Sequence, residues 1–489
     1  MTKYFISTAI PYVNGSPHAG HSLEYVQTDV MARYFRLKYG KENVFALTGS
    51  DENALKNVLA AEIAGKSTIE FIDEKTAEFQ KLSQTLNLSF DDFIRTTEER
   101  HILGAQKLWN AFNPEDLYMD TYDGMYCVGC EEFKTEKDLI DGLCPEHKKK
   151  PELVSEKNYF FKLSNYQNQI EKLITKDAIK IIPEKRKNEV LGFIREGLKD
   201  FSISRSRERA RNWGVPVPND ESQVMYVWVD ALSNYITALD YADNGTKYQD
   251  FWDNADTERI HVIGKGIVKF HALYWIGMLL SANVPLPTQE FVHGYVTVEG
   301  NKIGKSLGNA IHPEEIIKKY SIDAFRYYLL REIPAYGDGD FSWARMQEIY
   351  NADLVNGLGN LVSRVATMAS TTEGYRYVDY RSKSENGVGL KLDVDNALAK
   401  YQFDEALKRI WGEVNGVDSY LSRERPWKLV LSDENQKLSK YVILTTAIDS
   451  IKDIAESLAP FLPDTSKKVL DIFSEVVIQK PEPLFPRLA

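Results

Sequence analysis

The chain has 489 residues, of which 43% are hydrophobic and 12% aromatic, and its formal net charge is −11 at pH 7. This composition excludes an intrinsically disordered chain, and the acidic balance excludes a protein that coats nucleic acid indiscriminately, because non-specific binding requires net basic surface. The length predicts about two to four domains. Without a long apolar run or a charged and apolar leader, we expect a cytoplasmic protein with no membrane span.

The first 48 residues are typical of a βαβ unit with a parallel sheet. A short apolar run at Tyr4–Ile6 predicts a strand. A loop follows, and then a helix with Ser16 as its N-cap and Pro17 in its first turn. Apolar residues recur at helical spacing up to Gly40, and Val44–Leu47 predicts the second strand.

His18 and His21 fall in the predicted first turn of this helix. Backbone N–H groups without intrahelical partners and the positive end of the helix dipole favour phosphate there. Two imidazoles three residues apart could hydrogen-bond the phosphates of a nucleotide. The alternative is that both histidines are ordinary surface or capping residues.

Asp51 follows the second strand directly. Ligands of parallel sheets bind beyond the carboxyl ends of the strands, so we expect Asp51 near the two histidines, where it could hold an ammonium group. The alternative is a turn or capping aspartate. Residues 53–113 predict helices and a connecting strand that complete one half of a doubly wound sheet.

Near Leu117 the sequence changes from helical patterns to short strand-like runs and turns, which predicts an inserted module. It contains all three cysteines of the chain, in the pattern Cys127-Val-Gly-Cys130 and Cys144-Pro-Glu-His147. Two short-spaced pairs match a tetrahedral zinc site, and four protein ligands would close the coordination shell, so we expect one structural Zn²⁺. The alternative is a chance grouping. A disulfide is disfavoured in the cytoplasm.

Basic residues outnumber acidic ones between Glu184 and Arg211. Such a run is compatible with a local nucleic-acid-binding face or with a solvated helix face, and charge alone does not separate the two.

Two apolar and aromatic stripes follow where the αβ pattern resumes near Met225, each on a single helix face. Each stripe includes a polar group that core positions usually avoid unless it is satisfied. The stripes indicate either core packing or the walls of an apolar pocket. They consist of Trp228, Ala231, Leu232 and Tyr235, and of Ile267, His271 and Trp275.

Residues 291–298 predict a strand, and the glycine-rich segment that follows contains Lys302, Lys305 and Ser306. Lysines can neutralise a polyphosphate while glycines let a loop close, although such loops are also common surface turns. From about Asp340 the pattern is mostly helical, with a loop expected at 371–383.

Taken together, the His18-Ala-Gly-His21 and Lys302-Ile-Gly-Lys305-Ser306 motifs resemble the two signatures of class I aminoacyl-tRNA synthetases. Five further segments narrow the resemblance to the methionyl-tRNA synthetase family, and it covers essentially the whole chain. They are Ala9-Ile-Pro-Tyr-Val-Asn-Gly, the cysteine insertion, Tyr226-Val-Trp-Val-Asp-Ala, residues 263–271 and residues 292–298.

The resemblance implies an α/β fold with a Rossmann-type doubly wound parallel sheet, split by a zinc-containing connective insertion and followed by an α-helical bundle that binds the anticodon. The expected domains are the first half of the catalytic domain, the insertion, the second half with the signature loop, and the helical domain. Their ranges are 1–115, 116–224, 225–350 and 351–489.

The implied activity is ATP-dependent formation of methionyl-adenylate and transfer of methionine to the 3′ end of tRNA(Met), including initiator tRNA, by a methionine–tRNA ligase (EC 6.1.1.10). Mg²⁺ would accompany ATP, and Zn²⁺ would be structural. The implied catalytic residues are His18, His21, Lys302 and Lys305, and these four together with Gly20, Gly294 and Ser306 would bind ATP. The implied methionine-binding residues are Ile10, Tyr12, Asp51, Trp228, Ala231, Leu232, Tyr235, Ile267, His271 and Trp275. The implied anticodon-binding residues are Asn360, Arg364 and Trp427, and the implied zinc ligands are Cys127, Cys130, Cys144 and His147.

For the methionine side chain, aromatic walls suit a polarisable thioether, and weak donors from Tyr235 and His271 could distinguish sulfur from a methylene. The chain departs from the usual family pattern at four positions. Ala19 replaces a larger aliphatic residue, Gly304 replaces a serine, and Asn53 and Ala54 stand where many relatives have His-Gly. We expect no appended tRNA-binding module. Because dimerisation through such a module is then not expected either, we expect a monomer.

Two rival functions remain at this level. One is a class I synthetase for another apolar amino acid, or a simpler nucleotidyltransferase that shares the two-histidine helix. The other is a tRNA-binding or regulatory relative that has lost activation, which the intact histidines and lysines disfavour.

Overall fold

The computed structural model describes residues 2–129, 132–134, 136–145, 148–298, 300–303, 310–379 and 388–488. The chain divides into two compact units. Unit 1 consists of Met1–Pro17, Phe35–Gln84 and Leu88–His293, and unit 2 of His18–Tyr34, Thr85–Asn87 and Gly294–Ala489.

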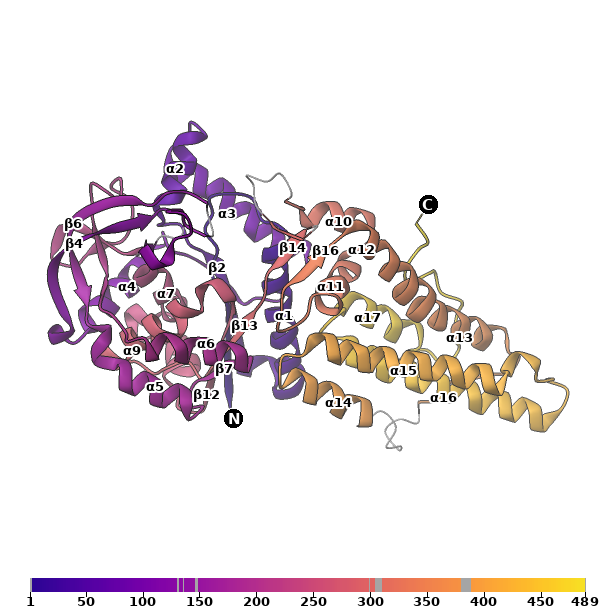
Figure 1. The fold of residues 1–489 in the computed structure, drawn as a ribbon. Helices are drawn as coiled ribbons and strands as arrows, with labels where there is room; N and C mark the ends of the chain where they lie inside the picture. Colours follow the sequence, from indigo (N-terminus) through magenta and orange to yellow (C-terminus); the bar gives the residue numbers. More distant parts are fainter. Residues whose placement is uncertain are drawn as a thin grey trace. The chain divides into compact units, whose positions relative to one another are not determined.

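Unit 1 is built on a six-stranded sheet in which every neighbouring pair of strands is parallel (Figure 1). The strands within residues 44–95 extend the sheet in one direction from its first strand, and the strands within residues 180–293 extend it in the other, so the order reverses between β1 and β12. Ligands of such sheets bind at this reversal. In sheet order the strands are β3 (Asp92–Arg95), β2 (Val44–Ser50), β1 (Lys3–Thr8), β12 (Thr257–Gly264), β13 (Gln289–His293) and β7 (Lys180–Ile182).

These observations confirm the predicted α/β fold with a parallel sheet. Every residue of β2 is buried, as expected for a strand of a parallel sheet that is covered on both faces. The edge strand β7 comes from residues that the domain prediction assigned to the insertion, yet it pairs with β13. A three-residue strand carries too little periodicity to reveal its partner, so this pairing is visible only in the folded chain.

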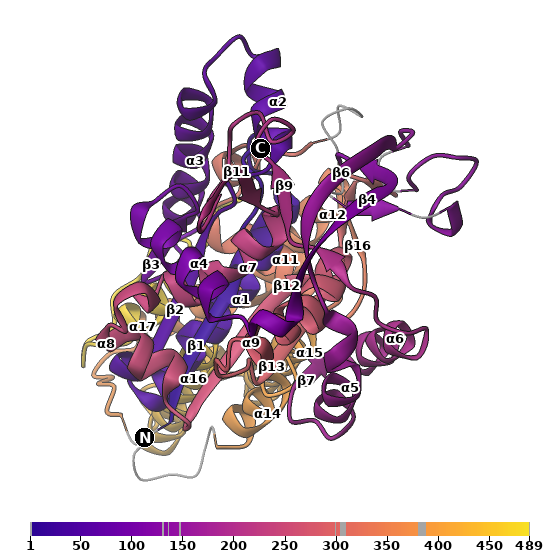
Figure 2. The ribbon, with the colours of Figure 1, turned by 90° about the vertical axis from the view of Figure 1, so that its left-hand side faces the viewer.

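Residues 117–225 also form two antiparallel sheets. The larger has the order β5-β4-β6-β8, and Figure 2 shows the long antiparallel strands β4 and β6 running side by side. The smaller has the order β10-β11-β9. The strands are β4 (Leu117–Cys127), β5 (Glu132–Lys134), β6 (Glu152–Phe161), β8 (Phe201–Ser202), β9 (Ser204–Ser206), β10 (Pro216–Val217) and β11 (Asp220–Met225).

The basic run at 184–211 does not form one free cationic face. Arg186 pairs with Glu189 and Lys187 with Asp177, and Arg205 is buried. These contacts favour the solvated helix and internal ion pairs over a nucleic-acid-binding face there.

Helix α1 (Ala19–Tyr39) begins later than predicted. Ser16 is not its N-cap. The carbonyl of His18 accepts the first helical bonds from the N–H groups of His21, at 3.0 Å, and Ser22, at 3.3 Å. His18 is therefore the capping residue.

Residues 19–34 of α1 belong to unit 2. The helices of unit 1 connect the strands of its sheets or cover them. They are α2 (Leu55–Ile63), α3 (Thr68–Thr85), α4 (Glu99–Ala111), α5 (Gln167–Thr175), α6 (Glu184–Arg195), α7 (Val227–Thr237), α8 (Thr246–Tyr248) and α9 (Ile276–Ser281), with the π-helical segments η6 (Gln249–Asp253) and η8 (Phe270–Trp275).

The strand predicted over 291–298 is divided between β13 in unit 1 and β14 (Val296–Val298) in unit 2. Gly294 lies at the break. A Cβ atom there would come within 2.0 Å of the Gly337 carbonyl oxygen, so only glycine allows this approach. β14 then pairs with β15 (Asn301–Lys302) and β16 (Gly339–Phe341).

Unit 2 is otherwise helical, as predicted from residue 340 onward, and Figure 1 shows its two longest helices, α15 and α16, running side by side. No helix in the described ranges is both long and apolar enough to cross a membrane. The remaining helices are α10 (Pro313–Lys319), α11 (Ile322–Arg331), α12 (Trp343–Ile349), η10 (Tyr350–Gly359), α13 (Asn360–Thr371), α14 (Val388–Leu398), α15 (Phe403–Glu424), α16 (Glu434–Leu458) and α17 (Pro463–Ile472).

Glu290 is a buried carboxylic acid in the main sheet, in register between Ile181 and His261. Neither of its oxygens has a hydrogen-bond partner among the described residues, and burial raises its pKa from 4.5 to about 8. The folded state therefore holds a proton that the unfolded chain releases between these two pH values. The resulting stability is fully present below pH 4.5 and is lost as the pH rises through 8.

We expect Glu290→Gln, which cannot ionise, to unfold at a higher temperature than the wild type at pH 8.5 and at a similar temperature at pH 5. The pKa shift corresponds to a few kcal/mol, at about 1.4 kcal/mol per pKa unit. Thermal unfolding of both proteins across this range measures the difference. A constant difference at all pH values would contradict the ionisation assigned to Glu290.

Candidate active site

Four of the predicted methionine-binding residues lie at the carboxyl ends of the central strands. Ile10 and Tyr12 follow β1, Asp51 follows β2 and Ile267 follows β12. The loop after β1 is tied to the end of β2, because the Asp51 N–H donates to the Pro11 carbonyl at 2.9 Å and Tyr12 forms a parallel bridge with Asp51. The topology therefore gathers these residues at the reversal of the sheet.

Helix α7 carries the first predicted stripe, and all of its residues are buried. The Trp228 indole stacks on Phe270 with 3.8 Å between ring centroids, and it meets the edges of Tyr12 at 6.5 Å and His271 at 6.4 Å. Ala231 and Leu232 lie on the same helix. The Trp228 Nε1–H is buried and has no hydrogen-bond partner among the described residues. This wall is therefore apolar and aromatic, and Trp228 adds a buried N–H donor to it.

Tyr235 and His271 are hydrogen-bonded to each other, with 2.8 Å between Oη and Nε2. The His271 Nδ1 lies 3.0 Å from the Ile267 carbonyl, which can only accept, so Nδ1 carries the proton and Nε2 accepts from Tyr235. Burial lowers the pKa of His271 to about 4, so the ring is neutral near pH 7. Both donors that the sequence assigned to a substrate sulfur are thus used inside the protein.

The second stripe differs from the predicted α-helix. Residues 270–275 form the π-helix η8, whereas Ile267 ends the short 3-10 segment η7 (Lys265–Ile267). Phe270, at the start of η8, is the residue that stacks on Trp228. Trp275 is fully buried and contacts Tyr235 and Trp252. His261, on β12, stacks on Tyr235 at 3.9 Å and bonds the Ser7 hydroxyl at 2.8 Å. The sequence analysis missed Phe270 and His261, since only their contacts identify them.

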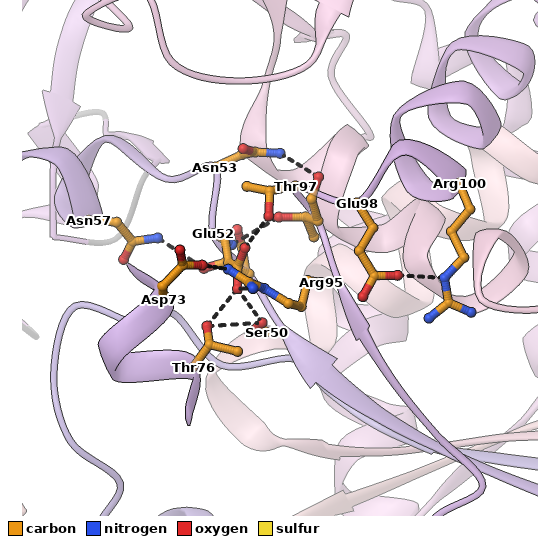
Figure 3. Close-up of polar contacts among 12 residues, drawn as sticks. Ser50, Glu52, Asn53, Asn57, Asp73, Thr76, Arg95, Thr97, Glu98 and Arg100 are labelled. Atoms are coloured by element: carbon orange, nitrogen blue, oxygen red, sulfur yellow. Dashed lines mark hydrogen bonds and ion pairs between the residues drawn. The ribbon is translucent and has the colours of Figure 1, made fainter. Parts of the chain in front are cut away.

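Asp51 is 3% exposed, and the loop that follows it is held by amide side chains. The Asn57 side chain donates to the Asp51 carbonyl at 2.9 Å, and the Asn53 side chain donates to the Thr96 carbonyl at 3.0 Å (Figure 3). Asn53, one of the departures from the family pattern, therefore supports the backbone through its Nδ2–H donor. The neighbouring Ala54 is buried.

In unit 2, the two histidines of the first signature form a reciprocal cap at the start of α1. The His18 Nδ1 accepts from the Gly20 N–H at 3.1 Å, and the His21 Nδ1 accepts from the His18 N–H at 3.1 Å. The rings stack with 3.9 Å between centroids. An accepting Nδ1 carries no proton, so in each neutral ring the donor is Nε2–H. A Cβ at Gly20 would come within 2.9 Å of the His18 ring, which explains the glycine.

The second signature lies on β15 and just beyond it, also in unit 2. The backbone of Lys302 ends β15, while Gly304, Lys305 and Ser306 lie outside the described residues. The chain resumes close to the first signature, because the N–H of Ala19 donates to the carbonyl of Ile311 at 3.0 Å. Ala19 is fully buried at this contact, so its small side chain allows the two segments to meet.

Two of the four predicted zinc ligands, Cys130 and His147, lie outside the described residues. Cys127 ends β4, the carbonyl of Cys144 accepts from the Lys148 N–H at 2.8 Å, and both cysteines are buried. Within the described ranges no group of three or more His, Cys, Asp or Glu residues could hold a metal. Thiol ligands nevertheless fit the chemistry of a zinc site.

The predicted anticodon residues lie in the helical part of unit 2. Asn360 is exposed at the start of α13, and Trp427 is 49% exposed. Arg364 is partly buried and donates from one guanidinium nitrogen to Asp418 at 2.6 Å.

The chain is similar to known proteins over nearly its whole length. The family model described as tRNA synthetases class I (M) matches residues 4–150 and 137–366. The methionine–tRNA ligase of Clostridium acetobutylicum is 39% identical over 482 residues, covering 96% of this chain and 72% of that protein. That of Brucella suis biovar 1 is 38% identical over 516 residues, covering 99% of this chain and 98% of that protein.

A solved structure extends this similarity to the fold. The structure of Mycobacterium tuberculosis methionyl-tRNA synthetase bound by methionyl-adenylate aligns with a TM-score of 0.92 and 33% sequence identity. The alignment covers 99% of this chain and 100% of that one.

Proposed function

This chain belongs to the class I tRNA synthetases, among the methionine–tRNA ligases, and on that basis we propose that it activates L-methionine with ATP and transfers it to the 3′ end of tRNA(Met), including the initiator. The family resemblance in the sequence is confirmed by its relatives. The observation that carries the proposal is the histidine cap of α1, because it presents two Nε2–H donors at a helix N-terminus.

In the first half-reaction, the methionine carboxylate attacks the α-phosphorus of ATP and pyrophosphate leaves. His18 and His21 donate from Nε2 to phosphate oxygens whose charge changes along the reaction, with Gly20 and Gly294 giving the nucleotide room. Lys302, Lys305 and Ser306 neutralise the leaving pyrophosphate. Catalysis then consists of positioning and charge stabilisation. Mg²⁺ would bind chiefly through the ATP phosphates and neutralise their charge.

For methionine, Asp51 holds the ammonium group and the side chain enters the aromatic wall. The pocket residues are Ile10, Tyr12, Trp228, Ala231, Leu232, Tyr235, Ile267, His271 and Trp275. Because Tyr235 and His271 already use their hydrogens, recognition of sulfur rests on the polarisable aromatic faces rather than on donors from these two side chains. Apolar fit alone discriminates between amino acid side chains by only about 1–3 kcal/mol per methylene. That fit depends on the shape of the wall, in which Trp228 packs closely on Phe270.

For tRNA, the helical domain at 351–489 reads the anticodon. Trp427 is exposed and can stack on an unpaired base, while Asn360 and Arg364 supply hydrogen bonds to base edges. The connective insertion at 116–224 separates the two catalytic halves, 1–115 and 225–350.

One Zn²⁺ would be held by Cys127, Cys130, Cys144 and His147 and would supply a structural cross-link. The Lys56 ammonium connects this region to the methionine pocket, since Nζ donates to the Gly129 carbonyl at 3.0 Å and lies 3.4 Å from the centre of the Tyr12 ring. We expect chelation to release one zinc per chain and to make residues 117–160 sensitive to protease, because a closed zinc site supplies folding energy to the segment around it.

Metal analysis and limited proteolysis before and after chelation measure this effect. Protease sites elsewhere in the chain serve as the internal control. A protein that contains no metal as purified and resists protease throughout the insertion would contradict the zinc site.

The function is tested by ATP–pyrophosphate exchange with each amino acid in turn, followed by charging of tRNA(Met). Exchange with methionine and not with leucine or valine supports the proposal. Exchange with leucine or valine but not methionine would overturn it in favour of another class I synthetase, and tRNA binding without any exchange would favour a non-catalytic relative.

A further inference from the structure

Glu52, the residue after Asp51, has a fully buried carboxylate that accepts four side-chain hydrogen bonds (Figure 3). The donors come from β2, α3, β3 and the segment after β3, all in unit 1. Oε1 accepts from Ser50 Oγ at 2.8 Å, Thr76 Oγ1 at 2.5 Å and Arg95 Nε at 2.8 Å, and Oε2 accepts from Thr97 Oγ1.

The backbone of Glu52 is also held at both ends. Its N–H donates to Thr96 Oγ1 at 2.9 Å, and its carbonyl accepts from the Trp213 indole at 2.9 Å. With the Pro11 and Asn57 bonds to Asp51, every backbone donor and acceptor of residues 51 and 52 is satisfied. The segment therefore has one defined backbone conformation.

Consecutive side chains of an extended segment point to opposite sides. Ser50 and Glu52 share one side, as their hydrogen bond requires, so Asp51 points to the other. The bonds of Glu52 therefore fix the direction in which the Asp51 side chain leaves the backbone, opposite to that of Glu52.

Burying a carboxylate is costly unless charge and hydrogen bonds compensate it. Among the described residues Arg95 is the one cation bonded to Glu52, and it is shared with Asp73. A buried ion pair is weak evidence for stability, so we look for the role of this carboxylate in the geometry that its four hydrogen bonds impose.

We propose that Glu52 is a positioning residue for amino-acid recognition, which holds the Asp51 carboxylate in the direction of the substrate ammonium group. This inference rests on the proposed function, in which Asp51 binds that ammonium. A carboxylate oriented before binding loses less conformational freedom when the ligand arrives, so its support contributes to affinity without touching the ligand.

The test is a comparison of two ligands, L-methionine and 4-(methylthio)butanoate, which lacks the ammonium group. We expect Glu52→Gln to weaken binding of L-methionine about tenfold. This is the lower end of the 10–100-fold loss of affinity that follows when a metal ligand loses the residue that hydrogen-bonds and orients it. Binding of the analogue should change by less than about twofold, because the analogue has no ammonium group to interact with the oriented Asp51 carboxylate. Equilibrium binding of both ligands, with thermal unfolding as a check of folding, gives the result.

Glu98→Gln is the matched control. Glu98 lies three residues after Arg95 and pairs with Arg100 at 2.5 Å (Figure 3). In the described part of the chain no hydrogen bond or ion pair joins the Glu98 side chain to residues 50–52, so both affinities should be unchanged. If Glu52→Gln fails to fold, Thr76→Val removes one donor to Oε1 at similar volume and should show the same selectivity at a smaller size.

Asp51→Asn separates this inference from the proposed function. If Asp51→Asn affects only L-methionine while Glu52→Gln or Thr76→Val weakens both ligands equally, the positioning role is overturned and the ammonium site stands. If Asp51→Asn itself weakens both ligands equally, the assignment of Asp51 to the ammonium group is overturned.

Discussion

Replacing His21 with alanine will lower the rate of methionine-dependent ATP–pyrophosphate exchange by about 10²–10³-fold, the usual cost of removing one preorganised donor from a developing charge. In the structure, the Nδ1 of His21 accepts from the His18 backbone, which leaves Nε2–H as the donor. Alanine removes both contacts. Exchange measured at saturating ATP and methionine gives the change in kcat.

Two measurements separate catalysis from stability in this variant. Loss of the cap should cost only about 1 kcal/mol of unfolding free energy, so the variant should remain folded at 25 °C. Binding of tRNA(Met) should be preserved, since the predicted anticodon residues lie far along the sequence in α13 and beyond. An exchange rate equal to that of the wild type would refute the catalytic assignment of His21.

Replacing Asp51 with asparagine will lower kcat/KM for methionine by about 10²-fold, because removing one member of a buried charge pair costs roughly 2–5 kcal/mol. Asp51 is 3% exposed, so little water screens its interaction with an ammonium group. The change should appear mainly as a higher KM for methionine, while the KM for ATP should stay within about twofold, since uniform binding is lost at one ligand only.

Steady-state exchange at varied methionine and then at varied ATP makes this comparison. Asp256→Asn, an exposed aspartate of the same unit, is the control and should leave both constants unchanged. An Asp51→Asn enzyme with an unchanged KM for methionine would contradict the ammonium site.

Local patterns in the sequence predicted those parts of the molecule that depend on neighbouring residues. The apolar runs at 4–6 and 44–47 predicted the parallel strands β1 and β2, and the spacing of Trp228, Ala231, Leu232 and Tyr235 predicted the single buried helix α7. The two-histidine motif was recognised as a helix start, although the cap proved to be His18 itself rather than Ser16. Family resemblance then supplied roles that periodicity cannot.

Only the tertiary structure decided which distant segments meet. β7 pairs with β13, and the strand predicted over residues 291–298 is interrupted at Gly294, because the Gly337 carbonyl lies where a side chain would be. His271 and Trp275 of the second stripe lie in a π-helix rather than an α-helix. The tertiary structure also revealed that the hydrogens of Tyr235 and His271 are used internally and that the donors to Glu52 come from positions 50, 76, 95 and 97. Such contacts join residues without a fixed spacing along the chain, so the sequence alone determined the elements and the chemistry they carry, while packing determined the partners.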